Sequence, residues 1–530
     1  MGDTERAARE AMFRQKGWWR DEPLQALLDR WAARTPNEPA LLHAGGAISF
    51  AELQGKVGAF AAGLHALGIG PGDAVAVQLP NIAEFVIAHF AIARCRAVMQ
   101  TVHMPYGPAE IGPLLRHSGA KAAIVLGKFK EASPAAMFLG LRHDAPALRD
   151  VIAVGAPADG ALNFNEVLGS VDVPPAGSVA TDPYLLLYTS GTTSSPKGVR
   201  VTHNHFLSNA RLCADQFGLG PDDRMMCAAP FTHLYGLYSL NLAFSAGATS
   251  CLLPAFTPPD FVAALKSYRP TALLAGPAHV AACLQNNLLK PEDVAELKFA
   301  VLSGSTVPPQ LSAAFEQLMP KGKVMQAWGM TELQFGACSR HEDSPAQRFE
   351  SIGRATPGTE LRVVAPEGAA LPAGEVGELQ IRGCSLFSGY LDNPAANEDI
   401  MAQGSWFRTG DLATIDVDGY VRLAGRTKEL INRGGIKFNP VDVEVALAAH
   451  PAVADIAIVP MPDPVLGEKA CAVVVLRPGQ SVTLAELTAW LDKAGVAKLK
   501  WPERLEAVNE MPLTPTRKIM KGALVKKLFG

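Results

Sequence analysis

One segment, Tyr188-Thr-Ser-Gly-Thr-Thr-Ser-Ser-Pro-Lys-Gly198, decides how the rest of the chain is interpreted. An apolar run over 184–188 enters it and an extended run over 198–202 follows, so it joins two predicted strands. Short hydroxyl side chains and backbone N–H groups suit a polyphosphate, and Lys197 can balance its charge. A Walker loop differs, because there Gly-Lys-Ser/Thr runs directly into a helix. The alternative is a Ser/Thr-rich surface turn.

Three further segments carry groups that a nucleotide site needs. Trp328-Gly-Met-Thr-Glu332 offers a ring that could stack on a base and a carboxylate that could ligate a cation held by phosphates. Trp406-Phe-Arg-Thr-Gly-Asp411 places a carboxylate after a glycine turn, suited to two ribose hydroxyls, and Gly425-Arg426 adds a cation. Each also has a structural explanation: a core tryptophan, a capping aspartate or a surface ion pair.

Composition narrows the class of protein. The 530 residues are 48% hydrophobic and 19% charged, and 48 Lys+Arg against 51 Asp+Glu give a net charge of −3. This balance provides no global basic field for nucleic acid or anionic lipid. The eight cysteines include no CxxC pair, which favours a reducing compartment. The amino terminus lacks a signal-peptide core, and the longest apolar run, 85–93, is too short for a bilayer. We expect a cytoplasmic protein with no membrane span and no nucleic-acid partner.

Strand-like runs alternate with helical patterns over most of the length, which predicts an α/β fold with parallel sheets. The expected strands cover 74–79, 249–253, 271–275, 299–303 and 323–328, and the expected helices cover 82–93, 259–268, 278–289 and 309–319. Ligands bind beyond the carboxyl ends of parallel strands. Gly276, Ser303-Gly304-Ser305 and Trp328-Gly329 should therefore face one crevice, unless the glycines are only connectors.

The pattern changes after about residue 350. Short strands over 377–382, 412–416 and 420–423 predict a small antiparallel β unit. A separate α+β region then follows, with helices near 440–449 and 484–493 and strands near 454–459 and 470–476. We place the domain boundary at Arg426 to Lys428, which gives a large domain over 1–427 and a small one over 428–530.

In their order along the chain, these motifs resemble the acyl-adenylate-forming superfamily of AMP-binding enzymes, which includes acyl- and aryl-CoA ligases, insect luciferases and nonribosomal peptide adenylation domains. The matches run from Tyr184 to Lys518, and nearly the whole chain is compatible. The phosphate loop, Arg408-Thr-Gly-Asp411 and Gly425-Arg-Thr-Lys-Glu-Leu-Ile431 are the most specific. The resemblance implies a large N-terminal domain of parallel α/β subdomains with a small β unit, and a small mobile C-terminal domain.

The resemblance also implies roles for single residues. The ATP phosphates would be held by Thr189, Ser190, Gly191, Thr192, Thr193 and Lys197. The remaining ATP contacts would come from Gly304, Ser305, Thr306, Trp328, Gly329, Met330, Thr331, Asp411, Arg426 and Lys518. Glu332 would bind Mg²⁺, Thr331 would contact the α-phosphate, and Lys518 would bridge carboxylate and phosphate during adenylation. His233 would stand beside the acyl pocket, Lys428 would be the hinge, and Gly435 would line the thiol tunnel.

Two positions depart from the family pattern. Ser194 stands where the phosphate loop usually has glycine, and Arg517 stands where glycine usually precedes the terminal lysine. The second departure affects the register of Lys518, although Lys521 comes too late in the chain to match well.

The implied activity is that of an AMP-forming carboxylic acid–CoA ligase using ATP, Mg²⁺ and CoA. No Ser-His-Asp set or cysteine nucleophile is evident, so direct transfer from acyl-AMP to the thiol is the simplest course. One alternative is a stand-alone ligase that loads a carrier protein, and another is a non-catalytic nucleotide-binding protein. A homodimer is left open.

By family position, the acid pocket is expected to consist of Phe231, His233, Leu234, Tyr235, Gly236, residues 278–279, Gly304, Gly329 and Met330. These residues include no Lys, Arg, Asp or Glu, so a charged substrate tail would be buried without a partner. We expect an acid with an uncharged tail, either aromatic, alicyclic or medium-chain. Tyr235 and Tyr238 favour a ring, because their hydroxyl tips could meet a ring substituent.

Overall fold

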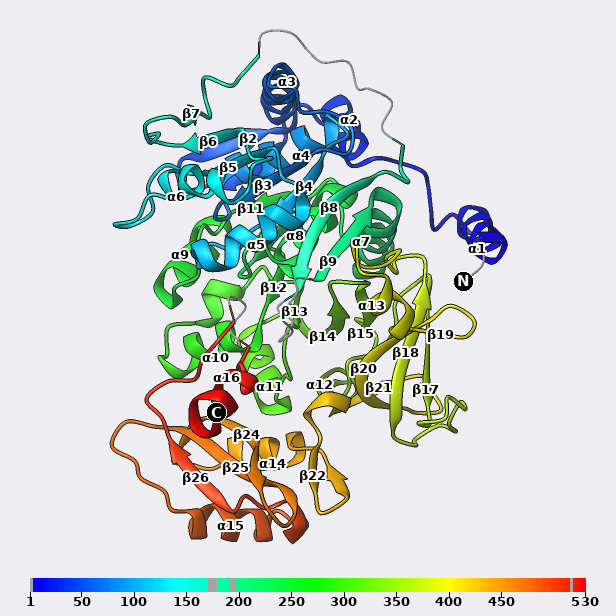
Figure 1. Ribbon diagram of the computed structural model, residues 1–530, viewed down its shortest axis with the longest axis vertical. Helices are drawn as coiled ribbons and strands as arrows, with labels where there is room; N and C mark the ends of the chain where they lie inside the picture. Colours follow the sequence, from blue (N-terminus) through cyan, green and yellow to red (C-terminus); the bar gives the residue numbers. More distant parts are fainter. Residues whose placement is uncertain (1–2, 170–178, 190–196, 515–517) are drawn as a thin grey trace. The chain divides into compact units, whose positions relative to one another are not determined.

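The computed structural model describes residues 3–169, 179–189, 197–514 and 518–530 (Figure 1). The chain divides into two compact units, Met1–Glu360 with Arg382–Trp406 and Leu361–Ile381 with Phe407–Gly530. The boundary predicted at 427/428 is that of a mobile domain, and it stays a prediction because the two compact units do not show which part of the chain moves.

One sheet of the first unit carries the predicted crevice strands. Its order is β16-β15-β14-β13-β12-β10-β11-β1-β2. The central strands are β10 (Arg224–Cys227), β11 (Thr249–Cys251), β12 (Ala272–Ala275), β13 (Phe299–Leu302) and β14 (Lys323–Met330). β12, β13 and β14 are neighbours and run parallel, with Ala275 opposite Leu302 and Leu302 opposite Gln326. Their carboxyl ends therefore meet at one edge, as the sequence predicts.

Helices follow these strands at nearly the predicted places. They are α9 (Pro258–Tyr268), α10 (Pro277–Gln285) and α11 (Pro309–Leu318). β12 and β13 are buried throughout, since a parallel sheet is covered on both faces. This explains why their sequences are continuous apolar runs and do not alternate.

The second sheet of this unit has the order β7-β6-β5-β3-β4-β8-β9. Its main strands are β3 (Ala74–Gln78), β4 (Val98–Thr101), β5 (Ala122–Leu126), β6 (Asp150–Val154), β8 (Pro183–Thr189) and β9 (Lys197–Thr202). β8 and β9 form an antiparallel pair in which Thr189 is opposite Lys197, so the phosphate segment connects their ends. Thr202 caps α7 (His203–Phe217) by accepting the backbone N–H of His205.

The second unit confirms the predicted β and α+β regions. β18 (Gly377–Gly383), β20 (Trp406–Ile415) and β21 (Val421–Arg426) pair antiparallel. A short 3₁₀ turn, η3 (Thr427–Glu429), leads to a sheet of order β23-β22-β25-β24 with β26 on β25. Its elements are β22 (Ile431–Arg433), β23 (Ile436–Phe438), α14 (Val441–Ala448), β24 (Val453–Asp463), β25 (Gly467–Leu476), α15 (Leu484–Lys493), β26 (Arg504–Ala507) and α16 (Lys521–Phe529).

The other elements complete the framework. They are α1 (Asp3–Gln15), α2 (Leu24–Arg34), β1 (Pro39–His43), β2 (Gly46–Ser49), α3 (Phe50–Ala66), α4 (Ala83–Arg94), α5 (Pro108–Ser118), α6 (Pro134–Gly140), β7 (Leu162–Asn163), α8 (Leu234–Ala246), β15 (Gln334–Cys338), α12 (Pro345–Glu350), β16 (Arg354–Ala355), β17 (Thr359–Val364), α13 (Pro394–Asp399) and β19 (Met401–Ala402).

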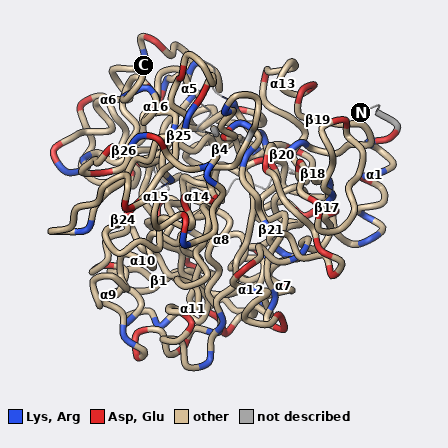
Figure 2. The backbone as a smooth tube through the Cα atoms, turned by 90° about the horizontal axis from the view of Figure 1, so that it is seen from below, with Lys and Arg blue, Asp and Glu red and all other residues tan. Residues whose placement is uncertain are grey.

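Three general expectations can be compared with the structure. Positive and negative residues are interspersed along the chain (Figure 2), in agreement with its near-zero net charge. The eight cysteines are all buried and free. Within the described ranges, no helix is long and apolar enough to cross a membrane.

Candidate active site

The phosphate segment is described only at its two ends. Thr189 is the last residue of β8 and Lys197 the first of β9. The predicted phosphate contacts Ser190, Gly191, Thr192 and Thr193, together with the departure at Ser194, lie outside the described residues.

The turn between β14 and β15 presents Thr331 and Glu332. β15 folds back antiparallel on β14, with Met330 opposite Gln334. A Cβ on Gly329 would lie 1.8 Å from the Gln334 carbonyl oxygen, so no side chain fits at this crossing. Glycine is therefore required for the tight turn that brings Glu332 to the end of the sheet.

Glu332 is a buried carboxylate with an identified donor. Its side chain belongs to a residue that is only 4% exposed, and Tyr390 Oη donates to Glu332 Oε1 at 2.7 Å. Burial, and then the neighbouring Glu332 charge, raises the pKa of the Tyr390 phenol well above its ordinary value. The phenol therefore keeps its proton and donates a hydrogen bond to the carboxylate.

Tyr390 also faces the lysine of the phosphate segment. Lys197 Nζ lies 5.4 Å from the centroid of the Tyr390 ring, within cation–π range. The sequence analysis missed Tyr390, because a tyrosine among Gly, Asp, Asn and Pro residues is an ordinary loop residue in sequence. Only the fold brings it to Glu332, 58 positions away.

Three of the predicted ATP contacts, Gly304, Ser305 and Thr306, follow the carboxyl end of β13. Gly304 has φ +99, a left-handed conformation that favours glycine, and Ser305 and Thr306 after it are exposed. Trp328, on the neighbouring β14, is 7% exposed. These residues thus occupy the edge where β12, β13 and β14 end together.

Several residues that were predicted to line the acid pocket lie at or just before the start of α8. His233 is the N-cap residue, and its Nδ1 accepts the backbone N–H of Tyr235 at 3.1 Å. The ring of His103 faces that of His233, with centroids 6.1 Å apart and an angle of 26° between the ring planes. A Cβ on Gly236 would lie 2.1 Å from the Pro230 carbonyl oxygen, so the helix packs directly on the preceding loop.

The expectation about the tyrosine tips is wrong. Tyr235 Oη donates to the Val301 carbonyl oxygen at 2.8 Å, and Tyr238 Oη donates to Asn209 Oδ1 at 2.6 Å. Both rings are buried, so their hydroxyls must be satisfied inside the protein. The argument for a ring substrate from these hydroxyls is therefore lost, while the apolar character of the pocket remains. His279 is likewise engaged, because its Nδ1 accepts the Gly276 N–H.

The donor set around Glu332 fits a metal ion held mainly by phosphates. Among the described residues, no group of three or more His, Cys, Asp or Glu side chains could form a protein-only cage. Mg²⁺ is usually bound by one or two carboxylates, waters and substrate phosphates, which agrees with a single carboxylate here.

Asp411 and Arg426 form a pair in the second unit. Arg426 Nε donates to Asp411 Oδ1 at 2.7 Å, and the two residues are opposite each other on β20 and β21. The glycine turn predicted just before Asp411 is wrong, because β20 continues through Gly410, which has a φ of +71 within the strand. The Asp411 side chain is 7% exposed and that of Arg426 is 52% exposed.

The other predicted residues of this unit lie on turns. Lys428 is exposed in η3, and Gly435 has φ +89 in the turn between β22 and β23. Lys518 is exposed, and its backbone N–H donates to Thr514 Oγ1 at 3.0 Å. Although the residue as a whole is exposed, its ammonium end is surrounded by protein: burial, and then the charge of Arg426, lower the pKa of Lys518, while Asp411 acts in the opposite direction.

Lys521 has a different environment from Lys518. Its Nζ pairs with Glu444 Oε1 at 2.8 Å and Glu429 Oε2 at 3.3 Å, so it joins the start of α16 to α14 and η3. This structural use of Lys521 agrees with the choice of Lys518 as the family lysine. Arg517 lies outside the described residues.

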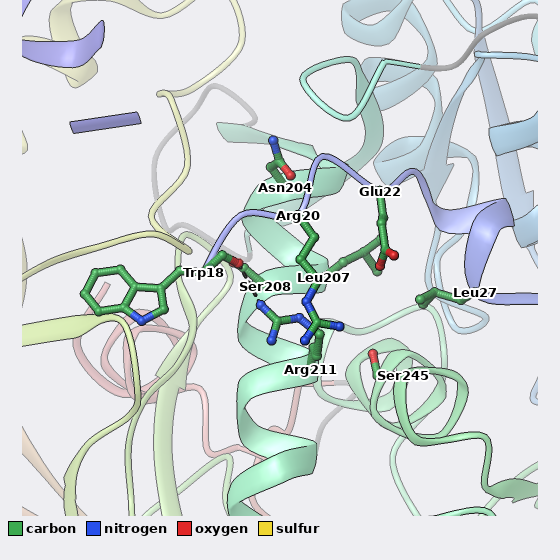
Figure 3. A pocket seen from close by; sticks show the side chains of 9 residues that line it. All are labelled: Trp18, Arg20, Glu22, Leu27, Asn204, Leu207, Ser208, Arg211 and Ser245. Carbon is green, nitrogen blue, oxygen red and sulfur yellow. Dashed lines mark hydrogen bonds between the residues drawn. The ribbon is translucent and has the colours of Figure 1, made fainter. Parts of the chain in front are cut away.

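A separate pocket of the first unit contains none of the predicted site residues. It lies between the N-terminal segment and helices α7 and α8, and the side chains of Arg20 and Arg211 point into it (Figure 3). Arg211 Nη2 donates to the carbonyl oxygens of Gly17 and Trp18. Its guanidinium thus fixes the N-terminal segment to α7.

Comparison with known proteins identifies the family. The AMP-binding enzyme model matches residues 28–391, and the AMP-binding enzyme C-terminal domain model matches residues 442–518. The chain is 32% identical to a medium-chain fatty-acid–CoA ligase of Escherichia coli K12, over 98% of this chain and 93% of the relative. It is 34% identical to a salicyl-AMP ligase/salicyl-S-ArCP synthetase of Mycobacterium tuberculosis, over 98% and 94%.

Solved structures of related enzymes support the same family. A crystal structure of an anthranilate CoA ligase in complex with anthranoyl-AMP superposes with a TM-score of 0.86 at 27% identity, covering 96% of this chain and 97% of that one. The chain belongs to the AMP-binding enzyme family, in the acyl- and aryl-CoA ligase branch of the acyl-adenylate-forming superfamily.

Proposed function

We propose that the protein activates a carboxylic acid with ATP, forming acyl-AMP and pyrophosphate, and then transfers the acyl group to CoA with release of AMP. The observation that carries this proposal is the buried Glu332–Tyr390 pair beside Lys197, at the end of the phosphate segment. Relatives named as acid–CoA ligases, aligned over almost the whole chain, give the same reaction class.

The chemistry follows from charge. A carboxylate is a poor acyl donor because its leaving group would be oxide, so one of its oxygens attacks the α-phosphorus of ATP and pyrophosphate leaves. The attack brings two anions together, and cationic groups must offset their repulsion in the transition state. We assign this role to Lys197 at the phosphates and to Lys518 between the carboxylate and the α-phosphate. When bound, Mg²⁺ would neutralise phosphate charge, and Glu332 would hold it.

Other residues orient the nucleotide. The Asp411 carboxylate is the group we assign to the ribose hydroxyls, with Arg426 holding Oδ1 so that the carboxylate keeps one orientation. Thr331 is assigned to the α-phosphate, and Gly304, Ser305 and Thr306 to the adenine. Thiolate attack on the acyl carbon of acyl-AMP then forms the thioester and expels AMP, with Lys428 as hinge and Gly435 beside the thiol.

The acid is expected to have an uncharged tail. The start of α8 offers Phe231, Leu234 and Gly236, with His233 hydrogen-bonded to the helix backbone. Both medium-chain and aromatic acids agree with this lining, and relatives named for each class align equally well. A carrier-protein thiol is the alternative acceptor, supported by the relative named salicyl-S-ArCP synthetase.

An ATP–pyrophosphate exchange assay tests the first half-reaction. The panel should contain benzoate-type, cyclohexane-type, hexanoate-type, dicarboxylate and amino acids, followed by thioester formation with CoA or with a phosphopantetheinylated carrier protein. Exchange with an uncharged-tail acid and release of the CoA thioester is the expected result. Absence of exchange with all acids would refute the proposal, and preference for a dicarboxylate or amino acid would refute the assignment of the pocket.

The cellular setting is also a proposal. Eight free, buried thiols agree with a reducing compartment, which supports the cytoplasm.

A further inference from the structure

We propose that Tyr390 is a positioning residue that sets the Glu332 carboxylate and the Lys197 ammonium before the nucleotide binds, and thereby determines how much Mg²⁺ adenylation requires. The inference rests on the proposed function, since it assigns Glu332 to the metal and Lys197 to the phosphates. It concerns a residue to which none of the motifs above gives a role.

The phenol holds the carboxylate through a short, charge-assisted hydrogen bond. The O–H of Tyr390 reaches Glu332 Oε1 at 2.7 Å, and both residues are buried, at 8% and 4% exposure. A buried carboxylate that loses such a donor is held less firmly in one orientation. Tyr390 thus fixes the orientation in which the Glu332 carboxylate meets a cation.

The ring of the same residue faces the lysine. Lys197 Nζ lies 5.4 Å from the ring centroid, so the negative face of the ring attracts the ammonium group. One side chain therefore contacts both the acidic and the basic member of the candidate site.

The backbone around Tyr390 is itself fixed from two sides. Asn397 Oδ1 accepts the Tyr390 N–H at 2.6 Å, and Asn397 Nδ2 donates to the Tyr390 carbonyl oxygen at 3.0 Å. The next residue, Leu391, donates its N–H to the Gly198 carbonyl oxygen on β9 at 2.8 Å.

Residues before Tyr390 also contact the turn between β14 and β15 that contains Glu332. Phe387 donates its N–H to the Glu332 carbonyl oxygen at 2.8 Å. Its ring packs edge-on against that of Tyr390, with centroids 5.0 Å apart. Residues 387–391 therefore connect the Glu332 turn to the strand that begins at Lys197, and Tyr390 occupies the centre of this connection.

The test compares Tyr390→Phe with a matched control, Tyr184→Phe. The first substitution keeps the ring and removes only the hydroxyl that meets Glu332. The second removes a buried hydroxyl that accepts a hydrogen bond from the neutral amide of Asn241, in a tyrosine that is 1% exposed against 8% for Tyr390. Binding of the non-hydrolysable analogue α,β-methylene-ATP is measured by calorimetry across a Mg²⁺ series, and Mg²⁺ dependence of ATP–pyrophosphate exchange is measured in parallel.

We expect Tyr390→Phe to raise the Mg²⁺ concentration for half-maximal binding about tenfold, in the range found for groups that orient metal ligands. Binding at saturating Mg²⁺ should stay within about threefold of wild type, because the ring still faces Lys197. Tyr390→Leu should add a further loss of about two- to fivefold at saturating Mg²⁺, since the ring contact is gone. Tyr184→Phe should leave the Mg²⁺ dependence unchanged.

A Mg²⁺ half-saturation for Tyr390→Phe within twofold of the Tyr184→Phe value would overturn the inference, as would an equal loss of binding at every Mg²⁺ concentration. Should Tyr390→Phe fail to fold, Asn397→Ser displaces the Tyr390 backbone without touching Glu332, and must raise the Mg²⁺ requirement. If wild type binds the analogue with Mg²⁺ but exchanges pyrophosphate with no acid, the proposed function fails, while the binding comparison still decides the role of Tyr390.

Discussion

Acidification should destabilise the first unit, because three buried histidines there stay neutral in the folded chain. Burial lowers the pKa of His89 to about 4, of His203 to about 3 and of His205 to about 4. Their surroundings are rigid: the His203 ring stacks on Tyr184 at 4.3 Å, and its Nδ1 accepts the Leu24 N–H at 3.1 Å. Protonation of such a ring requires the packing to open.

The sign and size of the effect follow from proton linkage. A histidine in the unfolded chain titrates near pH 6.5, so at lower pH the unfolded state binds more protons and the free energy of unfolding falls. The stabilisation is complete above pH 6.5 and is lost as the pH falls toward the folded pKa values. Between pH 7 and 5 each histidine contributes a loss of about 2 kcal/mol, which gives about 6 kcal/mol if all three become exposed together.

The loss of folding stability at low pH should also affect the candidate active site. His203 and His205 form the first turn of α7, directly after β9, and Tyr184 lies on β8. These two strands carry Thr189 and Lys197 at their ends. Analogue binding should therefore disappear over the same pH range in which the unit loses stability.

Urea unfolding followed by tryptophan fluorescence at pH 7, 6 and 5 measures the effect, since the Trp19 ring lies 5.5 Å from that of His205. Because burial also lowers the pKa of His103 to about 4, His203→Asn should remove about one quarter of the pH dependence. Replacement of the exposed His143 by Gln should leave the pH dependence intact. Equal urea midpoints at pH 7 and pH 5 would refute the reasoning. A pH dependence in His203→Asn as steep as in wild type would refute the share assigned to that ring.

Three further predictions concern the reaction. Lys518→Ala should slow ATP–pyrophosphate exchange about a hundredfold, because a cation at the transition state is lost. Thioester formation from supplied acyl-AMP should continue, and an equal loss of both half-reactions would contradict the role assigned to Lys518. Lys428→Pro should block thioester formation selectively, because proline fixes φ at the predicted hinge. Stopped-flow assays measure the rate of each half-reaction, and an unchanged overall turnover would contradict the hinge assignment. Glu332→Gln should raise the Mg²⁺ concentration for half-maximal analogue binding about tenfold, which corresponds to about 1.4 kcal/mol. If calorimetry finds the same Mg²⁺ dependence for the variant as for wild type, Glu332 is not a metal ligand.

Much of the fold could be predicted from local patterns. The runs that become β12, β13 and β14 are short, apolar and bounded by glycine or polar residues, so their strand character is visible in the sequence. Their helical partners also lie close to the expected positions, because periodicity within one element depends only on neighbouring residues. Asp411 was misplaced since a glycine before it resembles a turn, while a glycine with positive φ can equally remain inside a strand.

By itself, the sequence determined the family, the order of the elements and the residue types that a nucleotide and a carboxylic acid require. Each of these depends on short contiguous motifs, which can be recognised without knowing how the chain folds. Only the tertiary structure decided which groups meet. Tyr390 contacts Glu332 across 58 positions, and the hydroxyls of Tyr235 and Tyr238 bond to the interior. Such contacts depend on how separate elements pack, and a hydroxyl buried by that packing must find its partner inside the protein.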